Sequence, residues 1–243
     1  MRSLTQEFID LLNVKQLDSY LFQGQNTQLF GSHLMGGQLV AQALIAASKT
    51  TDRPAHSLHA YFIRSGRTDL PILFKVENLR DGKSFTTRQV NAWQAGHIIF
   101  SAMISFALIE TGLNNHIEAP DYPLPDHLLS EQQHKQLIYR IVKKLHSTYL
   151  CGNLFVKYMS NYNLLTTSLR PHGVSYANGG VRSASLDHSI YFHSAFRVDE
   201  WLLYDMDATV SSQSRGLNFG RIWQAGKLVC SVTQESLMRV KSR

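Results

Sequence analysis

The feature that most constrains this chain is a four-residue sequence that occurs twice. Trp93-Gln94-Ala95-Gly96 returns as Trp223-Gln224-Ala225-Gly226, 130 residues further along. The pair Tyr61-Phe62 recurs at the same offset as Tyr191-Phe192, and no gap is needed between the two matches. One offset shared over about 40 residues indicates a structural unit that is used twice. With 243 residues, the chain is long enough for two units of ordinary domain size.

Composition and charge exclude several classes of protein. Hydrophobic residues make up 44% of the chain and charged residues 17%, which is ordinary for a protein with a buried core. No apolar run approaches about 18 residues, and the N-terminus lacks an apolar signal core, so we expect no membrane span and a mature start. The net charge of +6 comes from scattered basic residues, which favours an anionic small ligand over nucleic acid. Two cysteines, Cys151 and Cys230, are too few for a disulfide framework and indicate a reducing compartment.

Apolar periodicity predicts the elements of the first half. A helix is expected from Ser3, and a second helix, rich in alanine, over residues 36–49. Strands are expected at 20–22, 57–64, 71–79, 84–93 and 97–108, with a hairpin turn at Asp81-Gly82. Because a single sheet must bury its apolar face, the alanine-rich helix is expected to pack against it.

The second half repeats this order after a connecting stretch. Residues 110–130 contain three prolines and read as a semi-rigid linker. One helix is expected to begin at Ser130, and a shorter one, capped by Ser160, to end at Pro171-His172-Gly173. Four strands are expected, at 183–196, 200–211, 215–224 and 227–239. Each half therefore reads as a helix followed by four antiparallel strands, with the first unit at 1–109 and the second at 131–243.

This arrangement, a helix wrapped by an antiparallel sheet in tandem, is similar to a double hotdog. A series of motifs resembles the acyl-CoA thioesterase II (TesB-type) family over nearly the whole chain. In the first half the motifs are Gly36-Gly37-Gln38-Leu39-Val40-Ala41-Gln42-Ala43-Leu44, His56-Ser57-Leu58-His59-Ala60-Tyr61-Phe62 and Leu79-Arg80-Asp81-Gly82-Lys83-Ser84-Phe85. In the second half they are Arg170-Pro171-His172-Gly173, Leu186-Asp187-His188-Ser189-Ile190-Tyr191-Phe192-His193, Glu200-Trp201-Leu202-Leu203-Tyr204, Ser214-Arg215-Gly216 and Gln234-Glu235. The resemblance implies an α+β fold with two hotdog units.

The resemblance also implies an activity, the hydrolysis of acyl-CoA to a fatty acid and free CoA. In the family an aspartate, a threonine or serine, and a glutamine of the second unit hold a water that attacks the thioester carbonyl. No covalent intermediate, cofactor or metal is implied. Carried over by position, the hydroxyl falls on Ser185, the glutamine on Gln234 and the carboxylate on Asn161.

Asn161 departs from the family pattern, and the departure changes the expected chemistry. An amide accepts a hydrogen bond but is no useful base, and losing a general base removes about 10²–10⁴ in rate. We therefore expect a weakened enzyme, or one that uses Asp187, His188 or His172 as the base. A second departure is the short stretch at 148–160, where the family has a strand region, so the second unit is expected to lack one or two strands.

A CoA substrate carries phosphates, which positive groups near a groove mouth would bind. Candidate contacts lie at predicted strand ends and turns, with one histidine in a family motif: Arg64, Arg80, Lys83, Arg88, Arg215 and His56.

Two other functions stay open, a non-catalytic acyl-CoA-binding module and a hotdog hydratase. The hydratase would need an Asp/His pair, but Asp187 and His188 are neighbours on a strand and are expected to point to opposite faces. We expect a cytoplasmic homo-oligomer, a dimer or tetramer. The C-terminal Lys241-Ser242-Arg243 is no peroxisomal address. Chain-length preference depends on pocket depth, which the sequence does not give.

Overall fold

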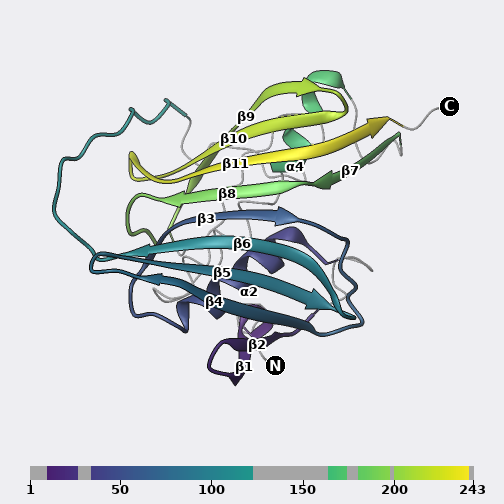
Figure 1. Ribbon diagram of the computed structural model, residues 1–243. Coiled ribbons are helices and arrows are strands. Elements are labelled where there is room, and N and C mark those ends of the chain that lie inside the picture. Colours follow the sequence, from purple (N-terminus) through teal and green to yellow (C-terminus); the bar gives the residue numbers. More distant parts are fainter. Residues whose placement is uncertain (1–9, 27–33, 123–163, 174–179, 198–199, 241–243) are drawn as a thin grey trace, which may run out of the picture.

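The computed structural model describes residues 10–26, 34–122, 164–173, 180–197 and 200–240. These residues form one antiparallel sheet of 11 strands in the order β1-β2-β4-β5-β6-β3-β8-β11-β10-β9, with β7 paired to β11. Figure 1 shows this sheet as a curved layer, with α2 behind the first half and α4 behind the second. The tandem hotdog fold expected from the sequence is confirmed.

In its described residues the first half contains one long helix and six strands. Their bounds are β1 Val14–Asp18, β2 Leu21–Gly24, α2 Gly36–Ser48, β3 Ala55–Phe62, β4 Ile72–Asp81, β5 Phe85–Gln94 and β6 His97–Ala107. α2 is buried along almost its whole length, from Gly37 to Ala47, with Ile45 partly exposed. Its alanines have small side chains, so the sheet can approach the helix from several sides and pack a dense core.

The described residues of the second half follow the same order, with four helical residues in α4. Its elements are α4 Leu164–Thr167, η2 Arg170–His172, β7 Val181–Ser185, β8 Asp187–Phe192, β9 Leu203–Ser212, β10 Arg215–Gln224 and β11 Lys227–Val240. Gly173 ends the η2 turn with φ of 64°, a left-handed conformation that glycine adopts without steric cost. The stop expected at Pro171-His172-Gly173 is therefore confirmed.

The internal repeat is also confirmed, down to single residues. β5 and β10 begin and end 130 residues apart. The ladder shifts register at Ala92/Trp93 in one half and at Ile222/Trp223 in the other. The two turns have matching backbones, with φ of 47° at Ala95 and 48° at Ala225. The same sequence thus makes the same bulged hairpin twice.

Several expected elements differ from the structure. The sequence analysis missed β1, because only Val14 of its five residues is buried and the alternation that marks a strand is absent. The single strand expected at 183–196 is wrong, since β7 and β8 are separate and β8 ends at Phe192. The strand expected from residue 200 begins at Leu203. The helix expected from Ser130 and the stretch at 148–160 lie outside the described residues.

The two halves join edge to edge through β3 and β8. Leu58 is paired with Ile190 and Tyr61 with Asp187, so the ladder continues across the boundary between the repeats. Residues 108–122 have no helix or strand and run from the end of β6 toward the second half (Figure 1). There the Tyr122 hydroxyl donates to Asp205 on β9, at 2.9 Å. Within the described ranges, no helix is long and apolar enough to cross a membrane.

Candidate active site

The two halves differ most on the inner face of the sheet. In the first half Leu58 pairs with Ile104, and both side chains are fully buried in the apolar core. The residues 130 positions later are His188 and Gln234, which are also fully buried. Likewise the pair Ala55 and Phe106 is replaced by the pair Ser185 and Ser236. Buried polar groups cost free energy unless they are satisfied, so this polar cluster makes the second half the candidate place for a functional site.

A bulge at Leu186 brings the two β7–β8 side chains of this cluster together. The pairing register with β11 shifts by one residue between Ser185 and Ser189. Because side chains alternate along a regular strand, Ser185 and His188 would otherwise face opposite sides of the sheet. The bulge is the physical reason why the single strand expected at 183–196 is interrupted. The first half has the equivalent irregularity between Ala55 and Ser57.

Gln234 lies at the centre of the cluster. Its Nε2 donates to Ser185 Oγ at 3.1 Å and to Ser236 Oγ at 3.3 Å. Its Oε1 lies 3.0 Å from His188 Nδ1. An amide oxygen can only accept, so His188 carries its proton on Nδ1 and fixes which end of the amide faces Ser185. The structure thus brings Ser185 and Gln234 together, and it adds His188 as the group that orients the glutamine.

Burial sets the protonation of the titratable groups in the site. Burial lowers the pKa of His188 to about 4, against the support of its hydrogen bond to Gln234. His188 is therefore neutral at physiological pH and a weak base. Burial, and less strongly the negative charge of Glu235, raise the pKa of Asp187, although its Oδ1 accepts the Glu235 backbone N–H at 2.6 Å.

The structure does not support a general base at the other positions considered from the sequence. Asn161 lies outside the described residues. His172 is exposed, in the η2 turn after α4. Asp187 and His188 point to opposite faces, as expected, and each has its own partner, Glu235 N–H and Gln234. The geometry therefore gives no support to an Asp/His pair of the kind a hydratase would use.

The guanidinium of Arg88 is buried and is bound by other groups of the protein. Its side chain is 2% exposed and makes an ion pair of 2.8 Å with Asp81. Its three guanidinium nitrogens also donate to Thr50, Asn78 and nearby carbonyl oxygens. All of these partners belong to the protein, so Arg88 ties the β4–β5 turn to the end of α2. In the alternating burial of β5, Arg88 is in phase with the buried residues Thr86 and Val90.

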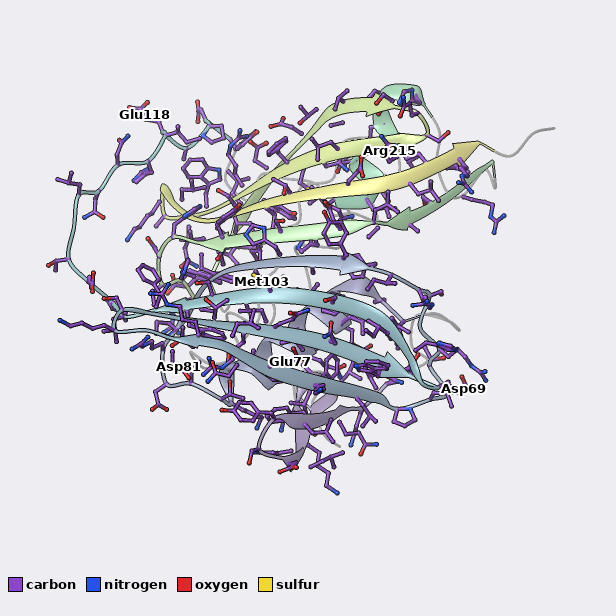
Figure 2. The ribbon with its side chains drawn as sticks, in the orientation of Figure 1. Asp69, Glu77, Asp81, Met103, Glu118 and Arg215 are labelled. Atoms are coloured by element: carbon purple, nitrogen blue, oxygen red, sulfur yellow. The ribbon has the colours of Figure 1, made fainter. Side chains whose placement is uncertain are left out.

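The remaining candidate substrate contacts fall into two groups. Arg80 and Lys83 flank the β4–β5 turn, and His56 bonds Ser105 at 2.8 Å and packs edge-on against Phe85 at the same end of the sheet. Arg64 instead donates to Ile98 O at the opposite end of β6, about 30 Å away for a strand of this length. In Figure 2 the labelled residues Asp81, beside Arg80, and Arg215 lie at opposite ends of the sheet.

Arg64 and Arg215 lie on the side of the polar cluster. Phe62, two residues before Arg64, donates its N–H to Leu186 O, next to Ser185. Arg215 Nε is 2.8 Å from Glu235, the neighbour of Gln234. Three further buried polar residues were not expected from the sequence: Ser168 after α4, Asn218 on β10 and Ser236 on β11. The 130-residue offset could have pointed to Asn218 and Ser236, since it aligns Asn218 with Arg88 and Ser236 with Phe106. Within the described residues, no cluster of His, Cys, Asp and Glu could hold a metal ion.

Comparisons with known proteins agree on one family. The model for "Acyl-CoA thioesterase N-terminal domain" matches residues 26–107, and the model for "Acyl-CoA thioesterase" matches residues 123–237. Acyl-coenzyme A thioesterase 8 of Mus musculus is 32% identical, over 95% of this chain and 88% of its own length. That alignment spans 287 positions, while 95% of 243 residues is about 231, so about 56 positions have no residue here.

Solved structures give the same result. The acyl-CoA thioesterase II TesB2 from Mycobacterium marinum is 33% identical, with a TM-score of 0.84 over 96% of this chain and 98% of that one. A hot dog fold protein from Alicyclobacillus acidocaldarius is 16% identical, with a TM-score of 0.73 over 97% of this chain and 99% of that one, and it shows the fold alone. By sequence, by domain models and by fold, this chain belongs to the acyl-CoA thioesterase family.

Proposed function

We propose that the chain hydrolyses acyl-CoA thioesters with a water held between Ser185, Gln234 and Asn161. The observation that carries the proposal is the partly buried hydrogen bond of 3.1 Å from Gln234 Nε2 to Ser185 Oγ. The two residues belong to different strands, 49 positions apart, and a bulge is needed for them to meet. The first half, which has Ala55 and Ile104 in their places, lacks such a group and keeps an apolar core there.

In this reaction the water oxygen bonds to the thioester carbonyl carbon and the C–S bond breaks. The proton lost by the water ends on the leaving sulfur, so the products are a carboxylic acid and the CoA thiol. His188 holds the Gln234 amide so that its nitrogen faces Ser185. The Asn161 amide cannot take the proton, which makes the reaction slow relative to that of a site with a carboxylate.

The nucleotide end of CoA is proposed to bind near Arg64 and Arg215, because only these candidates lie on the side of the polar cluster. A guanidinium binds a phosphate through charge-assisted hydrogen bonds. Arg64→Ala should therefore raise KM for acyl-CoA by about 10-fold, with little change in kcat. The matched control is Lys83→Ala at the far turn, which should leave KM unchanged. An equal rise in both variants would contradict this placement.

The hydrolytic site itself is tested by free-thiol release from decanoyl-CoA. Ser185→Ala and Gln234→Ala should each lower kcat by about 10²-fold or more, the size typical of a lost catalytic group. Thr233→Ala is the control, because Thr233 is the neighbour of Gln234 on β11 and points to the other face. Wild-type turnover in Gln234→Ala would refute the assignment.

A second candidate function is a non-catalytic acyl-CoA-binding module, and the amide at Asn161 is the observation that favours it. The assay separates the two, since a binding module would bind acyl-CoA and release no thiol. Several further expectations stay predictions: the division at 109/110 and 130/131, the homo-oligomer and the cytoplasmic location. We propose that the missing alignment positions fall between residues 110 and 160, which shortens the second unit.

A further inference from the structure

Asn218 on β10 carries a buried amide nitrogen that no group in the described part of the protein binds. The residue is fully buried, and its Nδ2 has no hydrogen-bond partner there. Its Oδ1 is engaged, because it accepts the Ser168 hydroxyl at 2.7 Å. An unpaired buried donor is uncommon and destabilising, so its presence in a folded protein calls for a ligand or a function.

The surroundings of Asn218 hold its amide in one orientation. Ser168 directly follows α4, and its hydroxyl fixes the oxygen end of the amide. Gly216 makes this contact possible, because a Cβ at that position would lie 2.3 Å from Ser168 Oγ. The nitrogen end is therefore directed away from the helix residue that binds the oxygen. Ser168 thus fixes the orientation of the Asn218 amide, as His188 fixes that of the Gln234 amide.

Asn218 lies directly beside the proposed hydrolytic group. It is the pairing partner of Gln234 in the β10–β11 ladder, where opposite Cα atoms are about 4.5–5.5 Å apart. Both side chains are fully buried on the inner face. The equivalent residue of the first half is Arg88, opposite Ile104, and protein groups bind all three of its guanidinium nitrogens. The donor is satisfied in the apolar half and unsatisfied in the half that carries the polar cluster.

We propose that Asn218 Nδ2 donates a hydrogen bond to the carbonyl oxygen of the bound thioester, an inference that rests on the proposed function. An amide nitrogen can only donate, so the partner of Nδ2 must be an acceptor. If the substrate supplies this acceptor, Nδ2 has no partner in the protein without substrate. As the water oxygen bonds to the carbonyl carbon, negative charge collects on the carbonyl oxygen. An electron pair of that oxygen re-forms the C=O double bond when the C–S bond breaks, and the C–S electron pair leaves on the sulfur, which takes the proton lost by the water. A preset donor at this place lowers the barrier.

The test compares two non-hydrolysable analogues of decanoyl-CoA by titration calorimetry. One replaces the thioester sulfur by a methylene and keeps the carbonyl. The other is the S-decyl thioether, which has no carbonyl. Asn218→Leu should weaken binding of the ketone analogue by about 10-fold and leave the thioether unchanged. It should also lower kcat with little net change in the melting temperature, because the variant removes an unsatisfied donor and, at the same time, the acceptor of the Ser168 hydroxyl.

Two further variants complete the design. Ser168→Ala keeps the amide but frees its orientation, and it should show a smaller selective loss for the ketone, which keeps the test valid if Asn218→Leu folds poorly. Asn91→Leu, the same change on the outward phase of β5, is the control and should match wild type.

The outcomes separate the inference from the proposed function. Equal effects on both analogues, or no effect on either, would overturn the role of Asn218 while leaving the hydrolase intact. A loss of kcat with unchanged binding of both analogues would also overturn it and assign the donor to the water instead. A wild-type protein that binds neither analogue would refute the proposed function and this inference with it.

Discussion

The buried pair His188 and Gln234 can be replaced by the pair that the protein itself uses in the first half. The change is His188→Leu with Gln234→Ile, which copies Leu58 and Ile104 into the equivalent places of the inner face. The hydrogen bond of 3.0 Å between His188 Nδ1 and Gln234 Oε1 couples the two residues. Each single change leaves one buried polar partner unsatisfied, which costs about 1–3 kcal/mol.

The double variant removes both partners, so the penalty for that hydrogen bond should largely disappear. We expect the double variant to be less destabilised than the sum of the single variants, by about 1–2 kcal/mol. Each single variant should melt about 2–12 °C below wild type, from about 2–4 °C per kcal/mol for a chain of this size. All three variants should lose thioesterase activity.

The assay is urea unfolding followed by far-UV circular dichroism, with the four proteins measured side by side. The interaction free energy of the double-mutant cycle is the quantity of interest. Additive effects, within about 0.5 kcal/mol, would refute the coupling through this hydrogen bond. Single variants as stable as wild type would show that neither polar group depends on the other.

Two more predictions concern the buried side chains of His188 and Arg88. Because the pKa of His188 is about 4 in the folded protein, below its ordinary 6.5, the unfolded chain binds the extra proton first as the pH falls. Stability should be complete above about pH 6.5 and decline toward pH 4, by on the order of 3 kcal/mol from this residue, and His188→Leu should flatten that part of a melting-temperature profile. An unchanged slope would contradict the burial of a neutral histidine. Separately, Arg88→Met should cost about 2 kcal/mol by chemical unfolding, since it leaves Thr50 and Asn78 without their donor, whereas the exposed Arg80→Met should cost less than about 0.5 kcal/mol. Equal costs would show that the buried Arg88 guanidinium is not structural.

Much of the fold could be predicted from the sequence, because short motifs of the first unit recur in the second unit at one constant offset. The offset of 130 residues predicted that β5 and β10 are equivalent, and Asp81-Gly82 marked the β4–β5 turn. The β1 strand was not predictable from alternation, since Val14 is buried and the other four residues of the strand are exposed. Bulges were not predictable either, because the residue at the bulge, Leu186, fits an apolar strand equally well.

The site shows the same limit. Ser185 and Gln234 came from the resemblance, and the structure gives the contact that supports them. The sequence could not tell whether Arg88 points to the core or to the solvent, because a strand offers two faces and the surrounding residues are mixed. Asn218 had no motif. Its significance follows only from a hydrogen bond that Nδ2 does not make and from its place opposite Gln234.

The most direct test of the proposed hydrolytic site is free-thiol release from decanoyl-CoA and palmitoyl-CoA, with wild type beside Asn161→Asp. If Asn161 occupies the place of the missing base, wild type is slow, and Asn161→Asp gains about 10²-fold or more in kcat on at least one substrate. A wild-type enzyme that is already fast, and that Asn161→Asp leaves unchanged, would contradict the placement of the third group.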